Sequence, residues 1–357
     1  MMKKDTAGAE RAGEEIPKEP LSKYLQEQLG LAGTLEVTQF SAGFSNLTYG
    51  VSVGDTHMVL RRPPKGANIA TAHDMGREYR VLTSVKPQYD LAPRPIHFCD
   101  NVDIIGAPFF LMERVEGVIL RGQLPKDHGL TPDWMQTLSA LAATALAKLH
   151  QVDIQSQELA SLGKPEGYID RQVTGWIGRY QKAATDVIPE MDQMASWMMA
   201  NQPKEGAAAL IHNDFKYDNI VWDAEGTPSI KAILDWEMAT LGDPLMDLGT
   251  TLAYWAEPDD PDIMKPYNPS WLPGNLNRDA FVQAYAEARG ISLVGRDVLF
   301  YYVFGLFKVA VIGQQIYARF KAGYTKDPRF GMLIHAVKAC AKTGIRALEQ
   351  EKISQLW

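Results

Sequence analysis

The chain changes character near residue 116, and this change limits the folds that it can adopt. Before it, short runs rich in β-branched, aliphatic and aromatic residues are separated by turn residues, as at 41–43 and 54–55. Such runs are typical of antiparallel strands. After it, apolar residues recur at spacings of three to five, which is typical of amphipathic helices. The sequence therefore predicts an α+β fold of two lobes, a small antiparallel sheet followed by a larger, mostly helical part.

The expected elements divide the chain into a tail and two lobes. We place a disordered tail at residues 1–25, an N-lobe at 26–115 and a C-lobe at 116–357, because residues 1–20 mix charges and lack an apolar stretch. N-lobe strands are expected at 35–40, 47–53, 56–61 and 109–114, with a helix at 72–85. C-lobe helices are expected at 131–152, 172–184, 190–201, 244–255, 278–288, 297–319 and 328–351, with a β interlude at 209–212, 220–222 and 230–234.

Composition excludes several classes of protein. The formal net charge of −7 argues against a general affinity for nucleic acid or anionic membranes. The two cysteines are too few for a disulfide framework or a Cys-rich zinc site, and they favour a reducing, cytoplasmic location. The most apolar segment, residues 299–313, is shorter than the roughly 18–20 residues of a membrane span and contains Lys308. We expect it to be a buried helix.

Two motifs lie in the β interlude of the C-lobe. Residues 212–219 read His-x-Asp-x-x-x-x-Asn, and Asp235 follows the apolar run 232–234. Phosphoryl transfer from ATP needs a carboxylate at the attacking hydroxyl, together with an amide oxygen and a second carboxylate that hold Mg²⁺ against the phosphates. Asp214, Asn219 and Asp235 are the candidates for these three tasks. The alternative is structural, since Asp and Asn also occur in turns and at strand ends.

Other polar residues near these motifs favour a structural interpretation. His212 ends an apolar strand, and we expect it to be a structural histidine with its hydrogen bonds satisfied and not a catalytic one. Asp243 and Pro244 are typical of an N-cap and the first position of a helix, and Asp247 falls in the first turn. Glu237 follows Asp235 closely, but the direction of its side chain is left open.

The N-lobe carries weaker candidates for nucleotide binding. The turn that contains Gly43, Phe44, Ser45 and Asn46 could lay backbone amides over phosphates, although a plain hairpin is the alternative. Arg61, at the end of the expected strand 56–61, could pair with Glu78 on the expected helix 72–85 and hold the phosphates. Arg62 is an alternative to Arg61, although alternation along the strand directs its side chain to the opposite face. Both arginines could instead be solvated strand ends. The backbone around Glu113 and Val115 could contact adenine, and no Walker A pattern occurs.

Taken in order, the pieces from about residue 35 to at least 255 resemble the aminoglycoside phosphotransferase-like branch of the protein kinase-like fold. The resemblance rests on residues 212–219, 234–237 and 242–248. It implies that Asp214 is the catalytic aspartate, that Asn219 and Asp235 are metal ligands, and that Asp247 supports the loop by hydrogen bonding. Residues 60–64 and 77–82 look most like the kinase-type domains associated with acyl-CoA dehydrogenases. Arginine stands where most kinases have lysine, and Asp-Trp-Glu replaces Asp-Phe-Gly.

These observations predict an enzyme that transfers the γ-phosphate of ATP, with Mg²⁺, to a hydroxyl of a small molecule. The acyl-CoA dehydrogenase association suggests a hydroxyacyl acceptor and a functional link to such an enzyme, by family analogy alone. The alternative class is a nucleotide-binding pseudokinase or partner-binding module without turnover. A polycationic acceptor would need an acidic cleft, which residues 257–262 could supply, although a solvated acidic loop is the favoured interpretation.

Overall fold

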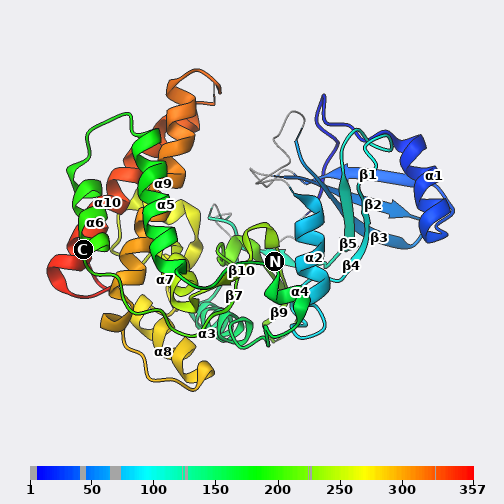
Figure 1. Ribbon diagram of the computed structural model, residues 1–357. Helices are drawn as coiled ribbons and strands as arrows, with labels where there is room; N and C mark the ends of the chain where they lie inside the picture. Colours follow the sequence, from blue (N-terminus) through cyan, green and yellow to red (C-terminus); the bar gives the residue numbers. More distant parts are fainter. Residues whose placement is uncertain are drawn as a thin grey trace.

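The chain folds into two lobes joined near residue 116 (Figure 1). The computed structural model describes residues 6–40, 46–64, 74–122, 124, 128–223, 225, 227–325 and 327–357. A sheet with two flanking helices makes the N-lobe, and helices around two small sheets make the C-lobe. The predicted α+β fold of a small antiparallel-sheet lobe and a larger helical lobe is confirmed.

The N-lobe sheet has five strands in the order β1-β2-β3-β5-β4, and every neighbouring pair is antiparallel. The four predicted strands are present, and one strand was missed because its residues are half-buried and its register shifts between Pro95 and His97. The strands are β1 (Leu35–Gln39), β2 (Leu47–Val53), β3 (Thr56–Arg62), β4 (Pro95–Cys99) and β5 (Phe109–Glu113).

The two faces of this sheet belong to different hydrophobic cores. On the outer face, Leu60 and Leu111 pack in a cluster with Leu21 and Leu25 of helix α1 (Lys18–Leu29). On the inner face, the alternating strand positions, such as Val59, pack with helix α2 (Met75–Val85) in a cluster that continues into the C-lobe. Because α2 shares its core with both lobes, it fixes the N-lobe against the site described below.

The prediction of a disordered tail through residue 25 is wrong for the residues that form α1. Leu21 and Leu25 are fully buried, four residues apart on one helical face. The chain before α1 also contacts the sheet, because the Glu14 carbonyl accepts hydrogen bonds from Tyr49 Oη at 2.6 Å and from Arg62 Nη2 at 3.0 Å. The charges in this segment are on its solvent side, which is why composition alone suggested disorder.

The chain enters the C-lobe at Gly117, where its backbone lies close to that of Trp222. A Cβ at Gly117 would lie 2.5 Å from the Trp222 carbonyl oxygen, so a larger residue would push the segments apart. Strand β6 then joins a three-stranded sheet, and a separate pair of strands lies beside it. These strands are β6 (Val118–Ile119), β8 (Ile220–Asp223) and β9 (Ser229–Ile233), with β7 (Ala209–Ile211) and β10 (Thr240–Gly242) as the pair.

Helices make up most of the C-lobe, and each predicted one is present. They are α3 (Pro132–Leu149), α4 (Gln157–Ala160), α5 (Tyr168–Ala183), α6 (Pro189–Ala200), α7 (Pro244–Tyr254), α8 (Arg278–Arg289), α9 (Leu299–Lys321) and α10 (Leu333–Gln350). Short 3-10 turns are η1 (Tyr217–Asn219), η2 (Trp236–Met238), η3 (Asp262–Tyr267), η4 (Pro269–Trp271), η5 (Gly295–Val298) and η6 (Pro328–Met332).

Helix α9 is the central helix of this lobe, and most of its apolar run 299–313 is buried, as predicted. It packs against α5, α6, α7 and α10. By length and composition alone it could cross a membrane, but 67% of its most apolar window is buried inside the protein. Gly249 and Gly305 let α7 and α9 approach closely, since a Cβ at Gly305 would lie 2.2 Å from the Gly249 carbonyl oxygen. This contact brings the middle of α9 towards the 212–219 loop.

Candidate functional site

The 212–219 loop, between β7 and β8, brings the three predicted polar groups of the C-lobe together. Asn219 Nδ2 donates hydrogen bonds to the Asp214 carbonyl oxygen at 2.8 Å and to Asp214 Oδ2 at 2.9 Å. The Leu234 amide donates to the Asn219 carbonyl oxygen at 2.8 Å, so Asp235, the next residue, lies beside the same loop. The loop therefore turns back on itself, as the spacing of Asp214 and Asn219 predicted.

Lys216 is a residue of this loop to which sequence reasoning assigned no role. Its Nζ donates to both carboxylate oxygens of Asp214, at 2.8 and 2.7 Å, and lies 4.9 Å from the centre of the Tyr254 ring. Burial opposes the charge of Lys216, but the Asp214 carboxylate keeps the pKa of this ammonium above its usual value. Its position two residues after the aspartate was the signal that could have identified it.

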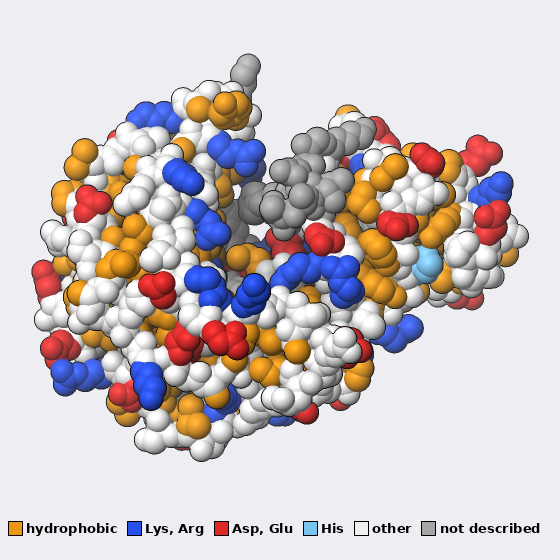
Figure 2. Space-filling model, in the orientation of Figure 1, with side chains coloured by type: hydrophobic (Ala, Val, Ile, Leu, Met, Phe, Trp, Pro, Cys, Tyr) orange, Lys and Arg blue, Asp and Glu red, His pale blue; other side chains and the backbone are white. Residues whose placement is uncertain are grey.

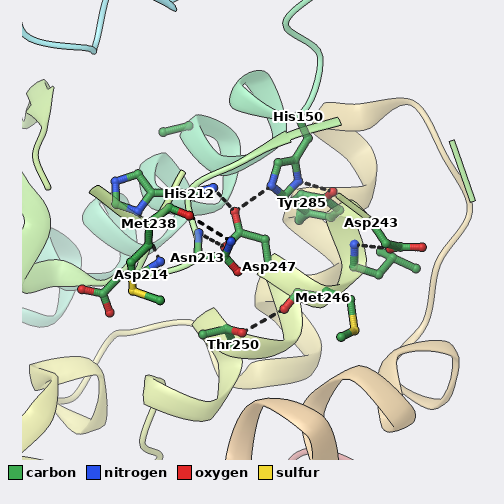
Figure 3. Close-up of polar contacts among 12 residues, drawn as sticks. His150, His212, Asn213, Asp214, Met238, Asp243, Met246, Asp247, Thr250 and Tyr285 are labelled. Atoms are coloured by element: carbon green, nitrogen blue, oxygen red, sulfur yellow. Dashed lines mark hydrogen bonds and ion pairs between the residues drawn. The ribbon is translucent and has the colours of Figure 1, made fainter. Parts of the chain in front are cut away.

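Asp247, on the first turn of α7, holds the start of the loop from beneath (Figure 3). Its carboxylate accepts hydrogen bonds from the backbone amides of His212 at 2.7 Å and Asn213 at 2.8 Å. Asn213 has φ of 67°, a conformation that is uncommon outside glycine and that these contacts help to hold. The hydrogen bonding by Asp247 that the resemblance implied is confirmed. Asp243 and Pro244 form the predicted helix start.

His150 completes this buried network. Its Nε2 lies 3.1 Å from Asp247 Oδ2, and its Nδ1 lies 2.7 Å from Tyr285 Oη. Burial opposes ionisation of Asp247, but the hydrogen bonds from His150 and from the His212 amide hold the pKa of that carboxyl below its usual value. In Figure 3 the Asp214 carboxylate points away from these groups. The network thus fixes the loop backbone and leaves the Asp214 side chain to other contacts.

His212 has the structural environment that the sequence predicted. It is fully buried, its Nε2 donates to the Leu234 carbonyl oxygen at 3.0 Å, and its Nδ1 accepts from the Asp214 amide at 3.3 Å. Burial lowers the pKa of this imidazole, which favours the neutral ring. His212 therefore links the loop to the strand end that precedes Asp235.

Asp235 lies at the boundary between the lobes, where Arg61 of β3 reaches it. Arg61 Nη2 is 3.0 Å from Asp235 Oδ1 and 3.2 Å from Glu237 Oε2, and Arg61 Nε is 3.3 Å from Glu78 Oε2. Burial opposes ionisation of Asp235, but the positive charges of Arg61 and Lys216 hold its pKa below the usual value. The predicted Arg61–Glu78 pair is therefore present, and it is part of a larger network.

Glu237 and Asn46 extend this network across the two lobes. Asn46 Nδ2, at the start of the N-lobe strand β2, donates to Glu237 Oε2 at 2.6 Å. The side chain whose direction the sequence left open thus turns towards the N-lobe. Glu78 is buried, and this burial raises the pKa of its carboxyl to about 8, although Arg61 acts in the opposite direction.

The two arginines of β3 lie on opposite sides of the sheet, as strand alternation predicted. Arg62 is buried on the other side, where its Nη2 donates to the Glu14 carbonyl oxygen at 3.0 Å. The alternative of solvated strand ends is wrong for both arginines, because neither is exposed. Arg61 is the one that faces the 212–219 loop.

The remaining N-lobe candidates are less clearly defined. Glu113 ends β5, and both its backbone and its carboxylate bond to Arg94, with the Glu113 amide 2.9 Å from the Arg94 carbonyl oxygen and the Arg94 amide 2.7 Å from Glu113 Oε1. Val115 follows at the crossing between lobes and is half-buried. Gly43, Phe44 and Ser45 lie outside the described residues. The nucleotide-binding roles of these residues stay predictions.

The acidic segment after α7 is partly buried. Glu257 and Asp260 are buried and form ion pairs with Arg278 of α8. The interpretation of a solvated acidic loop is therefore wrong for these two residues, because both pair with a buried arginine that lies 18 residues beyond Asp260 in sequence. Proximity along the chain gave no signal of this pairing.

The donor set at the lobe boundary suits a hard cation. Within the described residues, no group of three or more His, Cys, Asp or Glu side chains could hold a metal ion by itself. The Asp235 carboxylate and the Asn219 amide nevertheless offer two oxygen donors on neighbouring segments. Because Asn219 Nδ2 donates to Asp214, Oδ1 is the amide atom that can bind a cation. Two protein oxygens fit Mg²⁺, which usually completes its shell with water and phosphate oxygens.

Two proteins that are similar to this chain in sequence are named as acyl-CoA dehydrogenase family members. Human acyl-CoA dehydrogenase family member 11 is 32% identical over 357 residues, which cover 97% of this chain and 45% of the human protein. Mouse acyl-CoA dehydrogenase family member 10 is 34% identical over 86% of this chain and 29% of its own length. This chain therefore spans less than half the length of these two relatives.

Solved structures share the fold over most of the chain. A Ralstonia eutropha protein with the provisional name of aminoglycoside phosphotransferase has a TM-score of 0.80 and 27% identity, covering 94% of this chain and 99% of its own. Plasmodium vivax ethanolamine kinase has a TM-score of 0.60 at 13% identity, covering 90% and 86% of the two chains, and shows the fold alone. A model of the "phosphotransferase enzyme family" matches residues 36–291. The chain belongs to this aminoglycoside phosphotransferase-like family, as the loop, the strand-end aspartate and the two lobes indicated.

Proposed function

We propose that the protein is a Mg²⁺- and ATP-dependent phosphotransferase that phosphorylates a hydroxyl of a small molecule. The observation that carries the proposal is that Asp214, Asn219 and Asp235 lie together at one loop. Asp247 accepts hydrogen bonds from the backbone of this loop, and Arg61 of the N-lobe contacts Asp235. This is the set of groups that phosphoryl transfer requires.

Asp214 is the residue that would orient the attacking hydroxyl and accept its proton. Its carboxylate points away from the buried Asp247 network (Figure 3), which leaves it available to an acceptor. Lys216, 2.7 Å from Asp214 Oδ2, would offset the negative charge that gathers when a phosphate approaches this carboxylate. The Asp247 contacts would keep the loop backbone in place during the reaction.

Asp235 and Asn219 would hold Mg²⁺, which supplies positive charge to the phosphate oxygens when bound. Arg61 would contact the phosphates from the N-lobe, with Glu78 and Glu237 orienting its guanidinium. An arginine offers a planar pair of donors where a lysine offers a point charge, so Arg61 could bind two phosphate oxygens at once.

The acceptor class is suggested by the relatives. These relatives are named as acyl-CoA dehydrogenase family members, although this chain covers only part of the length of each. A hydroxyacyl compound is therefore the acceptor that we propose, together with a functional link to an acyl-CoA dehydrogenase. The fold itself hosts many substrates and does not distinguish among them.

A nucleotide-binding protein without turnover is the second candidate, and one contact favours it. Arg61 forms an ion pair with Asp235, the carboxylate that would bind the metal, so cation binding has to compete with this pair. If Arg61 kept Asp235 when ATP bound, the protein would hold nucleotide and transfer no phosphate. The presence of Asp214, Asn219 and Asp235 favours the enzyme.

The Asp214→Asn variant tests the proposal. We expect it to lose at least about 100-fold in turnover of ATP with a panel of hydroxylated metabolites, since a general base contributes on the order of 10²–10⁴-fold. Binding of Mg²⁺ and a non-hydrolysable ATP analogue, followed by thermal shift, should stay near the wild-type value. Asp259→Asn, at an exposed aspartate, is the matched control and should keep full turnover. Unchanged turnover in Asp214→Asn contradicts the enzyme, and binding without turnover in the wild type supports the second candidate.

A further inference from the structure

A pocket of about 330 Å³ opens beside the 212–219 loop. Its lining includes Asn213, the residue before Asp214, and groups from α2, α5 and α9. The space-filling view shows a hollow between the lobes, with a run of Lys and Arg side chains along the C-lobe rim beside it (Figure 2). Three of the lining residues are cations, namely Arg77, Arg179 and Lys308.

Lys308 is the most unusual of these cations, because it lies in the apolar interior of α9. Only 3% of its surface is exposed, and its Nζ donates to the Asn213 carbonyl oxygen at 2.9 Å and to Asn213 Oδ1 at 3.3 Å. Burial lowers the pKa of this ammonium to about 8. Both partners are neutral oxygens, and among the described residues no carboxylate forms an ion pair with Lys308.

The other two cations are also without an acidic partner in the described part of the chain. Arg77 donates to the backbone carbonyls of Glu237 at 2.9 Å and Ala239 at 2.6 Å. Arg179 lies 4.5 Å from the centre of the Trp176 ring, a cation–π contact. Lys308 Nζ lies 5.8 Å from the same ring, so Trp176 brings these two charges to one side of the pocket.

The lining contains one acidic residue, and its charge is already bound elsewhere. The Glu237 carboxylate contacts Arg61 at 3.2 Å and Asn46 at 2.6 Å, at the boundary between the lobes. The pocket therefore holds an excess of positive charge. The buried Lys308 ammonium is costly because it is removed from water without an ion-pair partner, and the neighbouring positive charges of Arg77 and Arg179 add to this cost. A ligand that brings negative charge would offset this cost.

We propose that this pocket is an acceptor subsite that binds an anionic group, a carboxylate or a phosphate, through Lys308, Arg179 and Arg77. The inference rests on the proposed function and deepens it. An acceptor anchored there would have its hydroxyl beside Asp214, since Lys308 contacts the residue that precedes it. The Trp176 ring provides an apolar surface for the part of the acceptor between the two groups. A polycationic acceptor would meet repulsion at the same place.

Paired probes of matched shape test the charge preference of the pocket. Each pair has a hydroxylated carboxylic acid and its amide, or a hydroxylated phosphate ester and its parent alcohol, with chains of about three to eight carbons, chosen to span the pocket volume. Affinity is measured by calorimetry on the full chain with Mg²⁺ and a non-hydrolysable ATP analogue. We expect a charged probe to bind at least about tenfold more tightly than its neutral partner, as one or more charge-assisted hydrogen bonds imply. Whether the acid or the ester shows the preference identifies the anion.

Variants test two of the three cations, Arg179 and Lys308. Arg179→Gln changes an exposed side chain, and we expect it to reduce the charged-over-neutral preference to about threefold or less, a loss typical of removing one charged contact. Lys308→Met, of similar length, should reduce the preference further, with thermal unfolding as a check on its folding. The matched control is Lys182→Gln, an exposed cation on the same helix that does not line the pocket. It should keep the wild-type preference.

The outcomes separate this inference from the proposed function. Equal affinity for charged and neutral probes, no binding of any probe, or a preference that survives in both Arg179→Gln and Lys308→Met overturns the subsite. ATP turnover measured on the same samples reports the function independently. Turnover without charge preference rejects only the subsite, while charge preference without nucleotide binding or turnover rejects only the phosphotransferase.

Discussion

Arg61 and Arg278 are both buried among carboxylates, yet the two networks are built differently. Around Arg278 every partner is also buried, with 6% of Glu257 and 1% of Asp260 exposed. Arg278 also donates to the carbonyls of Trp255 at 2.9 Å and Ile353 at 3.1 Å, and Glu257 accepts from Ser354 Oγ at 2.6 Å. The Arg278 network is closed, and it fastens the C-terminal segment to α8.

Around Arg61 the network is open on one side. Asp235 is 32% exposed and Glu237 is 17% exposed, whereas Arg61 itself is 8% exposed. One guanidinium faces three carboxylates from two lobes, Glu78, Asp235 and Glu237. The difference teaches that a buried arginine in a carboxylate cluster can be a structural clamp or part of a binding site. Solvent access to the carboxylates distinguishes the second case, because a cation can then join the cluster.

Removing the closed arginine should have the largest effect on stability. Arg278→Met leaves two buried carboxylates without a counter-ion, and we expect a loss of about 3–5 kcal/mol in the free energy of unfolding. Chemical denaturation measures this loss. Affinity for Mg²⁺ and ATP in the folded fraction should not change. A stability loss below about 1 kcal/mol would show that the network is not the clamp described here.

Removing the open arginine should act mainly on nucleotide binding. We expect Arg61→Met to weaken ATP affinity about 10–100-fold, since one or two charge-assisted hydrogen bonds to phosphate are lost. Its stability loss should be smaller than that of Arg278→Met, because Asp235 and Glu237 can be solvated. Arg61→Lys is the control that keeps the charge and should fall between the two in calorimetric titrations. If Arg61→Met binds ATP as well as the wild type, Arg61 is not a phosphate ligand.

Glu78 should give a smaller effect, visible in the pH dependence of stability. Its pKa is about 8 in the folded protein and 4.5 in the unfolded reference, so the folded state holds an extra proton between these values. Stability from this group is therefore lost as pH rises from about 4.5 to 8. Glu78→Gln removes this contribution, so its melting temperature should fall less than that of the wild type between pH 5 and 8. Parallel curves for the two proteins would contradict the raised pKa.

The sequence predicted the parts of this molecule that depend on local pattern. Strand alternation separated Arg61 from Arg62, and the spacing of Asp214 and Asn219 predicted the loop that joins them. The Arg61–Glu78 pair was predicted, but the pairs of Arg61 with Asp235 and of Arg278 with Asp260 were not, because no local pattern links the segments that they join. Helix α1 was missed because only Leu21 and Leu25 mark its buried face. Lys308 was noticed only as a charge within an apolar run.

The most direct test of the open network is the Mg²⁺ dependence of nucleotide binding in the wild type and in Asp235→Asn. Calorimetry with a non-hydrolysable ATP analogue, with and without Mg²⁺, measures it. If Asp235 binds the cation, the wild type should bind the analogue at least about tenfold more tightly with Mg²⁺, as the loss of one carboxylate–metal contact implies. Asp235→Asn should lose most of this gain while Asp214→Asn keeps it. The same Mg²⁺ gain in Asp235→Asn and in the wild type would contradict the account.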